Sequence, residues 1–172
     1  MIKFDRFTQK ARESLEKAQA AMTQLKQTQL DTEHLLYGIT FVEGSLVDGV
    51  LEHAGLDVQD GRGQIRKLVE RGQVLDDSAG GGGTGQIYLT PDAHATLEQA
   101  EDEMEQMGDK FVGTEHILLA LISIRRGRAS ALLAKIGLSR DAVYAALKEL
   151  RGTRSLDSES GEEQYQALER FT

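Results

Sequence analysis

Two stretches of the sequence decide the fold: DTEHLLYGI at residues 31–39 and GTEHILLAL at residues 113–121. Each places Thr-Glu-His directly before a run of apolar residues that is typical of a helix. Threonine is a good N-cap residue, so we predict two helices that begin with Thr32 and Thr114 as their caps. The same helix start therefore occurs twice in one chain.

The two stretches belong to a longer duplication with a constant offset of 82 residues, since 32 + 82 = 114. Thr8 corresponds to Thr90 and Gly55 to Gly137, so no insertion is needed between them. Fifteen of the positions from 7 to 68 carry the identical residue in the second copy. That is about one in four, against roughly one in fifteen expected at ordinary residue usage. The chain is therefore two copies of one helical module.

Each copy divides into four helices by its apolar spacing and its capping residues. The markers are N-cap residues at the first and fourth helices and a glycine after the third: Thr8, Asp57 and Gly55 in the first copy, and Thr90, Ser139 and Gly137 in the second. No segment alternates like an exposed strand. We expect an all-α fold of eight helices, in which two pseudo-symmetric four-helix repeats pack as one domain.

Composition marks the boundaries of this domain. Four consecutive glycines at 80–83 predict a flexible linker between the repeats, and the polar, acidic stretch after Gly152 predicts a flexible tail. The expected divisions are repeat one 1–70, linker 71–88 and repeat two 89–150, which together form one domain 1–150, followed by a connector 151–172.

The bulk composition excludes several classes of function. The chain has no cysteine, which excludes disulfides and thiolate zinc sites, and its formal charge of −8 disfavours nucleic acid and anionic membranes as partners. The start resembles no signal peptide, and no apolar run reaches the length of a membrane span. We expect a cytoplasmic protein whose partners are other proteins.

Motifs for catalysis or cofactor binding are missing. Gly80 and Gly85 have the spacing of a phosphate-binding loop, but Gln86 and Ile87 follow where that loop needs lysine and a hydroxyl, so no nucleotide site is expected. The four histidines form no metal-binding pattern, and polar first-turn residues explain those at 34 and 116. We expect no catalytic residues, no metal and no cofactor in this chain.

The whole chain resembles the N-terminal domain of AAA+ protein unfoldases of the ClpB and ClpC class. The resemblance rests on FDRFTQKARESLEKAQ near the start, the paired Thr-Glu-His stretches, LLAKIGLSRDAV in the second repeat and ELRGTRSLDSESGEEQYQALERFT at the end. It implies the front piece of a longer chain, with a hexameric ATPase that binds ATP and magnesium beyond Thr172. The linker and tail look like ClpB, a disaggregase, whereas the Thr-Glu-His pair looks like ClpC, which feeds a ClpP-type peptidase.

The resemblance implies a recognition module for unfolded or tagged substrates or for adaptor proteins, monomeric as an isolated domain. The alternative is a structural role in gating ring assembly or activity without substrate contact. In ClpC relatives, the glutamates that match Glu33 and Glu115 bind phosphoarginine, which makes Thr32, Glu33, Thr114 and Glu115 the candidate site. Alternatively, both acids only favour their helix N-termini. Asp31 replaces the family's usual glycine and disfavours phosphate at the first site, so the sequence favours the second.

Overall fold

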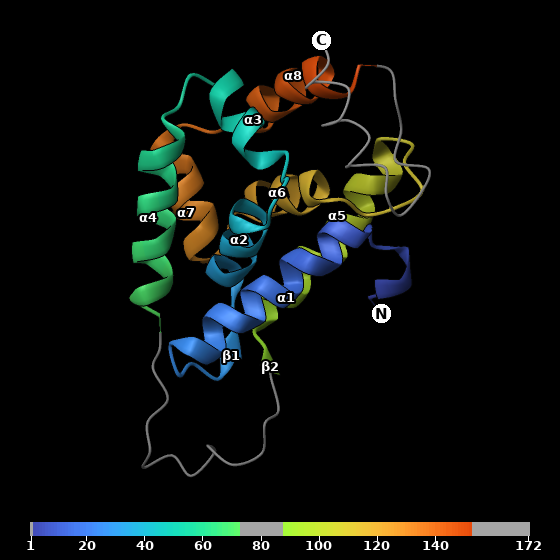
Figure 1. Ribbon diagram of the computed structural model, residues 1–172. Coiled ribbons are helices and arrows are strands. Elements are labelled where there is room, and N and C mark those ends of the chain that lie inside the picture. The colour runs from blue at the N-terminus through green and yellow to red at the C-terminus, as the bar shows by residue number, and fades with distance from the viewer. Residues whose placement is uncertain (1, 73–87, 153–172) are drawn as a thin grey trace.

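The computed structural model describes residues 2–72 and 88–152 of the chain. Eight α-helices account for most of these residues, together with a short 3-10 helix, η1 (Phe4–Arg6), and two strands of two residues each. In Figure 1, α2 and α6 lie at the centre of the molecule and the other helices surround them. The fold is all-α, as the sequence predicts.

The helices repeat with the offset seen in the sequence. Adding 82 to the bounds of α1 and α2 reproduces the bounds of α5 and α6, so the duplication of sequence is a duplication of structure. Repeat one consists of α1 (Gln9–Gln24), α2 (Thr32–Phe41), α3 (Val47–His53) and α4 (Val58–Glu70), and repeat two of α5 (Pro91–Gln106), α6 (Thr114–Ser123), α7 (Gly127–Ile136) and α8 (Arg140–Arg151).

The two repeats are joined by short extended segments that the sequence analysis did not predict. Strand β1 (Gln29–Leu30), ahead of α2, pairs in parallel with β2 (Tyr88–Leu89), ahead of α5. The symmetry-related contact is a parallel bridge between Phe7 and Val112. Each pairing takes one partner from each repeat, so the backbone hydrogen bonds tie the two copies together.

One hydrophobic core runs through both repeats. Its centre is formed by α2 and α6, where Leu35, Leu36, Ile117 and Leu118 are at most 1% exposed. A module of this size has a marginal core on its own, because a small chain buries a small fraction of its surface. The shared core removes that limit, and the repeats pack as one domain.

Most of the predicted helix ends are confirmed. A side-chain oxygen accepts the backbone N–H three residues further on at four predicted N-caps: Thr8, Asp57, Thr90 and Ser139. The glycines predicted to end the third helices, Gly55 and Gly137, have φ angles of 78° and 85°. This left-handed conformation is the one in which glycine costs least.

The predicted starts of α2 at Thr32 and of α6 at Thr114 are confirmed, but the N-caps predicted at these two threonines are wrong. Both threonines are the first residues of their helices, and the caps are Asp31 and Gly113. Oδ1 of Asp31 accepts the N–H of Thr32 at 2.8 Å and the hydroxyl of Thr90 at 2.7 Å. Asp31 thus caps α2 and also ties it to the start of α5, a contact between repeats that the local sequence does not reveal.

The expected flexible linker and tail lie mostly outside the described residues, which exclude 73–87 and 153–172. At their described ends, Tyr88 belongs to β2 rather than to the linker, and Arg151 is the last residue of α8 rather than part of the connector. No helix in the described part of the chain is long and apolar enough to cross a bilayer.

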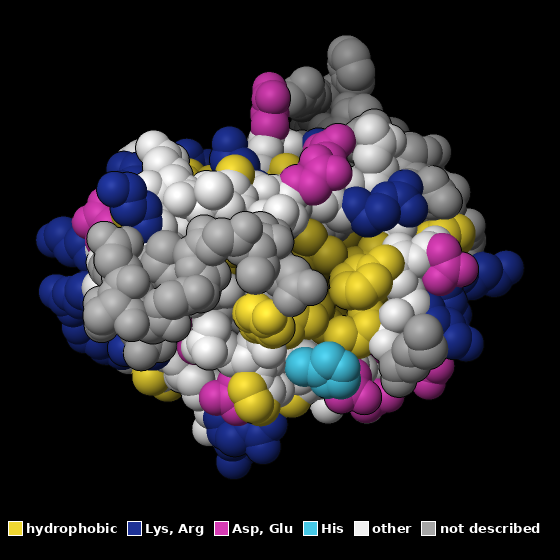
Figure 2. Space-filling model, turned by 90° about the horizontal axis from the view of Figure 1, so that it is seen from below, with side chains coloured by type: hydrophobic (Ala, Val, Ile, Leu, Met, Phe, Trp, Pro, Cys, Tyr) yellow, Lys and Arg dark blue, Asp and Glu magenta, His cyan; other side chains and the backbone are white. Residues whose placement is uncertain are grey.

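The surface differs in character from one region to another. Figure 2 shows the molecule from the end at which β1 and β2 lie in Figure 1, with hydrophobic side chains gathered at the centre of the view. Tyr88 and Leu89 in β2 are 56% and 37% exposed. Lysine and arginine side chains gather at the left edge of Figure 2, the side on which α4 and α7 run in Figure 1.

Candidate functional site

Each Thr-Glu-His stretch is held in place by its histidine. Nδ1 of His34 accepts the backbone N–H of Asp31 at 2.9 Å, and Nδ1 of His116 accepts that of Gly113 at 2.8 Å. Both imidazoles are buried. The side chain three residues into each helix thus reaches back to the cap, as in a capping box. This explains the repeated histidine without a metal.

The other ring nitrogen, Nε2, of each histidine also has a hydrogen-bond partner, and the two partners occupy equivalent positions in the two repeats. Nε2 of His34 lies 2.5 Å from Oε1 of Gln27, and Nε2 of His116 lies 2.7 Å from Oδ2 of Asp109. Because Nδ1 accepts a hydrogen bond, Nε2 carries the proton and donates it. Both imidazoles are therefore neutral in the folded protein, and burial lowers the pKa of each histidine.

These histidines predict that the domain loses stability in mild acid. The unfolded chain takes up protons on His34 and His116 near the ordinary histidine pKa of about 6.5. The folded chain, in which both pKa values are lower, binds fewer protons there, so acid favours unfolding. The histidine contribution to stability is present above that pH and is lost below it. We expect the midpoint of thermal unfolding to fall between about pH 7.5 and about pH 5.5.

A double variant isolates the histidines from the other titrating groups. Glutamine at the third helical position can also reach back to the cap, so His34→Gln with His116→Gln keeps a capping group that does not titrate. Its profile of midpoint against pH should be flatter than that of the wild type. An equally steep profile would assign the acid sensitivity to other groups.

Glu33, the first candidate acid, is buried beneath an arginine of the other repeat. The glutamate side chain is 2% exposed, and its Oε2 lies 3.5 Å from Nη1 of Arg128 at the start of α7. Its Oε1 is buried and has no hydrogen-bond partner in the described part of the chain. Burial raises the pKa of Glu33, with a further contribution from Asp31, while Arg128 opposes the change.

A cavity of about 370 Å³ lies beside Glu33. It is bordered by the end of repeat one and the start of α7, and its lining residues are Thr28, Gln29, Asp31, Glu33, His34, Arg71, Gly72 and Arg128. The side chain of Arg128 is 53% exposed, and its Nη1 donates to the carbonyl oxygen of Arg71 at 3.2 Å. The first acid therefore lies next to an open space with two arginines at its edge.

Glu115, the second candidate acid, lies beneath a buried arginine. Its side chain is 0% exposed, and its Oε2 lies 3.5 Å from Nη1 of Arg151, which is 5% exposed at the end of α8. Nη2 of Arg151 contacts Oδ1 of Asp109 at 2.6 Å, and the same Asp109 accepts from His116. The second acid thus belongs to a closed charge cluster of Glu115, Arg151, Asp109 and His116.

The threonines of the candidate site have packing roles. Thr32 and Thr114 are both 0% exposed. The hydroxyl of Thr32 accepts the N–H of Ala129 at 3.3 Å, a contact from α2 to α7 across the repeats. The sequence analysis named both acids and both threonines but did not identify Arg128, Arg151 or Asp109. The only local signal is that Asp109 and Gln27 occupy the same position of the repeat.

The described residues hold no group of three or more histidine, aspartate or glutamate side chains placed to bind a metal ion.

The geometry defines a class of protein: a helical double-repeat domain whose two buried acids each face a guanidinium. The chain belongs to the Clp repeat (R) N-terminal domain family, which matches residues 6–166. Family membership identifies it as a non-catalytic domain of AAA+ chaperones.

Curated relatives include both types named by the resemblance. The chain is 32% identical over 170 residues to chaperone protein ClpB of Porphyromonas gingivalis, covering 99% of this chain and 19% of the relative. It is 30% identical over 155 residues to the negative regulator of genetic competence ClpC/MecB of Bacillus subtilis, covering 90% of this chain and 18% of the relative. The chain thus spans about a fifth of the length of these relatives.

Solved structures share the fold. The N-terminal domain of Hsp104 from Candida albicans matches with a TM-score of 0.77 at 22% identity, covering 91% of this chain and 98% of that one. The N-terminal domain of ClpV1 ATPase from Escherichia coli matches with a TM-score of 0.70 at 16% identity, covering 88% of this chain and 89% of that one. At these identities the likeness concerns the fold alone.

Proposed function

We propose that this chain is the substrate- or adaptor-recognition domain of a hexameric, ATP-dependent Clp chaperone that works in the cytoplasm. The observation that carries the proposal is the pair of buried acids, each with a guanidinium 3.5 Å from its carboxylate. In both repeats, a guanidinium of the chain itself occupies the position that we propose for the arginine of a tagged substrate. The same geometry serves a ClpB-like disaggregase or a ClpC-like partner of a ClpP-type peptidase.

The first site is the one that a ligand can enter. Arg128 covers Glu33 but is 53% exposed, so a substrate guanidinium can displace it at little cost in desolvation. A phosphoryl group on that guanidinium would then meet Arg71 and the displaced Arg128 at the edge of the cavity. The charges at the site therefore fit phosphoarginine better than unmodified arginine.

The second site is blocked in this arrangement. Arg151 is held by Asp109 at 2.6 Å as well as by Glu115, and it is buried, so an incoming guanidinium would have to break a buried ion pair. The sequence alone favoured this second site because Asp31 disfavours phosphate at the first. Asp31, however, already uses its Oδ1 to cap α2 and to bind Thr90. We therefore propose that Glu33 is the main receptor.

The test is a calorimetric titration of the 172-residue chain with a phosphoarginine peptide. Glu33→Gln removes the charge that receives the guanidinium and should weaken binding by at least about tenfold, the usual worth of a charge-assisted hydrogen bond. Glu115→Gln should leave the affinity unchanged, because Arg151 covers that acid. The exposed Glu52→Gln serves as a matched control, and the same peptide with unmodified arginine should bind more weakly. Absence of binding at about millimolar peptide, an affinity near −4 kcal/mol, would end the phosphoarginine hypothesis.

A regulatory role is the second candidate, and Arg151 is the observation that favours it. This residue ends α8, directly before the connector, and is locked in a buried cluster at the start of α6. The cluster can set how the domain is held relative to whatever follows it. The two roles separate when substrate capture and ring assembly are compared for the full-length chaperone with and without residues 1–150. Unchanged capture with altered assembly would favour the regulatory role.

A further inference from the structure

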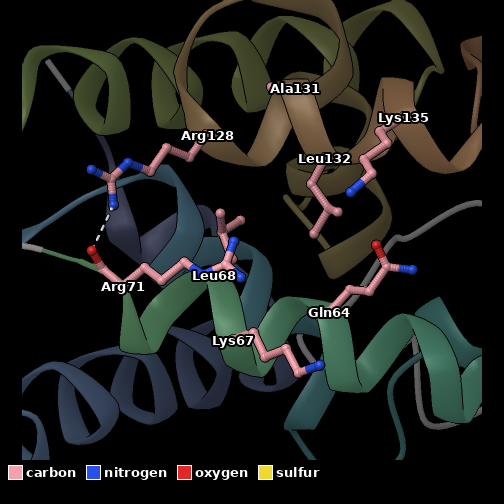
Figure 3. A pocket seen from close by; sticks show the side chains of 8 residues that line it. All are labelled: Gln64, Lys67, Leu68, Arg71, Arg128, Ala131, Leu132 and Lys135. Atoms are coloured by element: carbon pink, nitrogen blue, oxygen red, sulfur yellow. Dashed lines mark hydrogen bonds between the residues drawn. The ribbon is translucent and has the colours of Figure 1, made fainter.

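The surface between α4 and α7 forms a groove with a regular pattern of side chains. Each helix contributes four residues at positions i, i+3, i+4 and i+7, which lie on one helix face. The groove has a volume of about 460 Å³ and is lined by Gln64, Lys67, Leu68 and Arg71 from α4 and its end, and by Arg128, Ala131, Leu132 and Lys135 from α7. Figure 3 shows these two rows facing each other.

The internal symmetry of the molecule shows what a closed version of this groove looks like. The equivalent pair is α3 and α8, which pack against each other directly. Leu150 of α8 lies so close to Gly49 of α3 that a Cβ on the glycine would be 3.2 Å from its Cδ1. The same positions in the α4–α7 pair are Leu68 and Ala131, which instead line an open groove.

The side chains that line the open groove carry mainly positive charge. Four of its eight lining residues are cationic and none is acidic, in a chain whose formal net charge is −8. Lys67, Arg71 and Lys135 form no ion pair within the described ranges, and of the four only Arg128 has a carboxylate partner, Glu33. The groove is thus a local positive surface on an acidic domain, with Leu68, Ala131 and Leu132 between the charges.

We propose that the α4–α7 groove is the docking site for an acidic amphipathic helix of a partner protein. Its leucines would fill the space between Leu68 and Ala131, and its carboxylates would lie against Lys67, Arg71, Arg128 and Lys135. This inference rests on the proposed recognition role and names the chemical class of partner. It concerns a groove that adjoins the Glu33 cavity and shares only Arg71 and Arg128 with it.

The occupant is a helix because the groove offers it no backbone partners. The lining consists of side chains on two helices, whose backbone groups are used within the helices, so an extended segment would leave its own N–H and C=O groups unpaired. A helix satisfies these groups internally. Nucleic acid is disfavoured because the lining has no aromatic side chain on which a base could stack, and the domain as a whole is acidic.

The test uses a labelled helical peptide of about 14 residues, which is about four turns. Its leucines are spaced alternately three and four residues apart, so that they form one helix face, and its other residues are mainly glutamates. We expect it to bind the 172-residue chain, and we expect Lys67→Glu with Lys135→Glu to raise the Kd by at least about tenfold at low salt. Leu68→Gln should also weaken binding. Lys17→Glu with Lys148→Glu changes the net charge equally at exposed lysines elsewhere and should leave the Kd unchanged. Circular dichroism checks that each variant is folded.

Three results would overturn the inference: equal binding of a peptide with lysines in place of the glutamates, equal weakening by the control pair, or tighter binding of an oligouridine than of the acidic peptide. Failure here is distinguishable from failure of the proposed function. If the groove variants bind phosphoarginine peptide normally and no variant affects the acidic peptide, the recognition role stands and the groove assignment falls. Loss of acidic-peptide binding in Lys67→Glu with Lys135→Glu, but not in Glu33→Gln, supports the groove as a separate site.

Discussion

Replacing Arg151 with methionine should lower the free energy of unfolding by about 3–5 kcal/mol. The guanidinium is 5% exposed and lies 2.6 Å from Asp109, whose carboxylate is 0% exposed and also accepts from His116. Methionine keeps much of the apolar stem but leaves the buried carboxylates of Asp109 and Glu115 without their cation. Lys148→Met, an exposed change on the same helix, should shift stability by less than about 0.5 kcal/mol. Urea unfolding followed by circular dichroism gives both values.

The equivalent site in repeat one suggests a second substitution that should restore part of the stability lost in Arg151→Met. Its histidine pairs with the neutral Gln27 instead of with a carboxylate that needs a cation. Asp109→Asn combined with Arg151→Met gives His116 the kind of neutral partner that His34 has in repeat one, because an amide oxygen still accepts from His116. The double variant removes the unpaired charge at position 109, and Glu115 is the one acid of the cluster that still lacks its guanidinium. We expect the double variant to be more stable than Arg151→Met alone. A double variant that loses the sum of the two single losses would mean that Asp109 and Arg151 do not act as a unit.

Replacing Gly38 with alanine should destabilise the domain by about 3 kcal/mol or more, at the upper end of the usual cost of overpacking. A Cβ at Gly38 in α2 would lie 2.1 Å from the backbone oxygen of Ser14 in α1. Backbone atoms cannot move aside as a flexible side chain can, so the two helices must separate. The position matters because α2 also carries Glu33. A shift of α2 away from α1 would move Glu33 relative to Arg128 of α7.

Gly63→Ala is the matched control for Gly38→Ala. Gly63 is also inside a helix, α4, but a Cβ there would meet nothing within 4 Å. Alanine should therefore stabilise this helix by about 0.5–1 kcal/mol, the helix-propensity difference between the two residues. Thermal unfolding of the two variants should shift the midpoint in opposite directions. A small loss at Gly38 would show that α1 and α2 can separate without disturbing the core.

The sequence by itself determined the repeat and its helices. The constant offset of 82 residues, the Thr8 and Thr90 caps and the glycines at 55 and 137 depend only on residues within one or two turns, and the structure has them where the pattern placed them. The same reasoning misplaced the caps of α2 and α6 by one residue, because threonine is also a preferred cap residue and its position ahead of the apolar run is compatible with either assignment. What distinguishes Asp31 is its contact with Thr90 from the other repeat.

Only the tertiary structure decided how the two copies differ. Glu33 and Glu115 are equivalent in sequence, yet Arg128 reaches the first from an exposed position and Arg151 seals the second. Leu68 and Leu150 are likewise equivalent, yet one lines an open groove and the other lies against Gly49. The partners in each case come from segments far apart in the chain, brought together by the packing of one repeat on the other. Local periodicity fixes which face of a helix is buried, but the identity of the side chain that meets it depends on the whole fold.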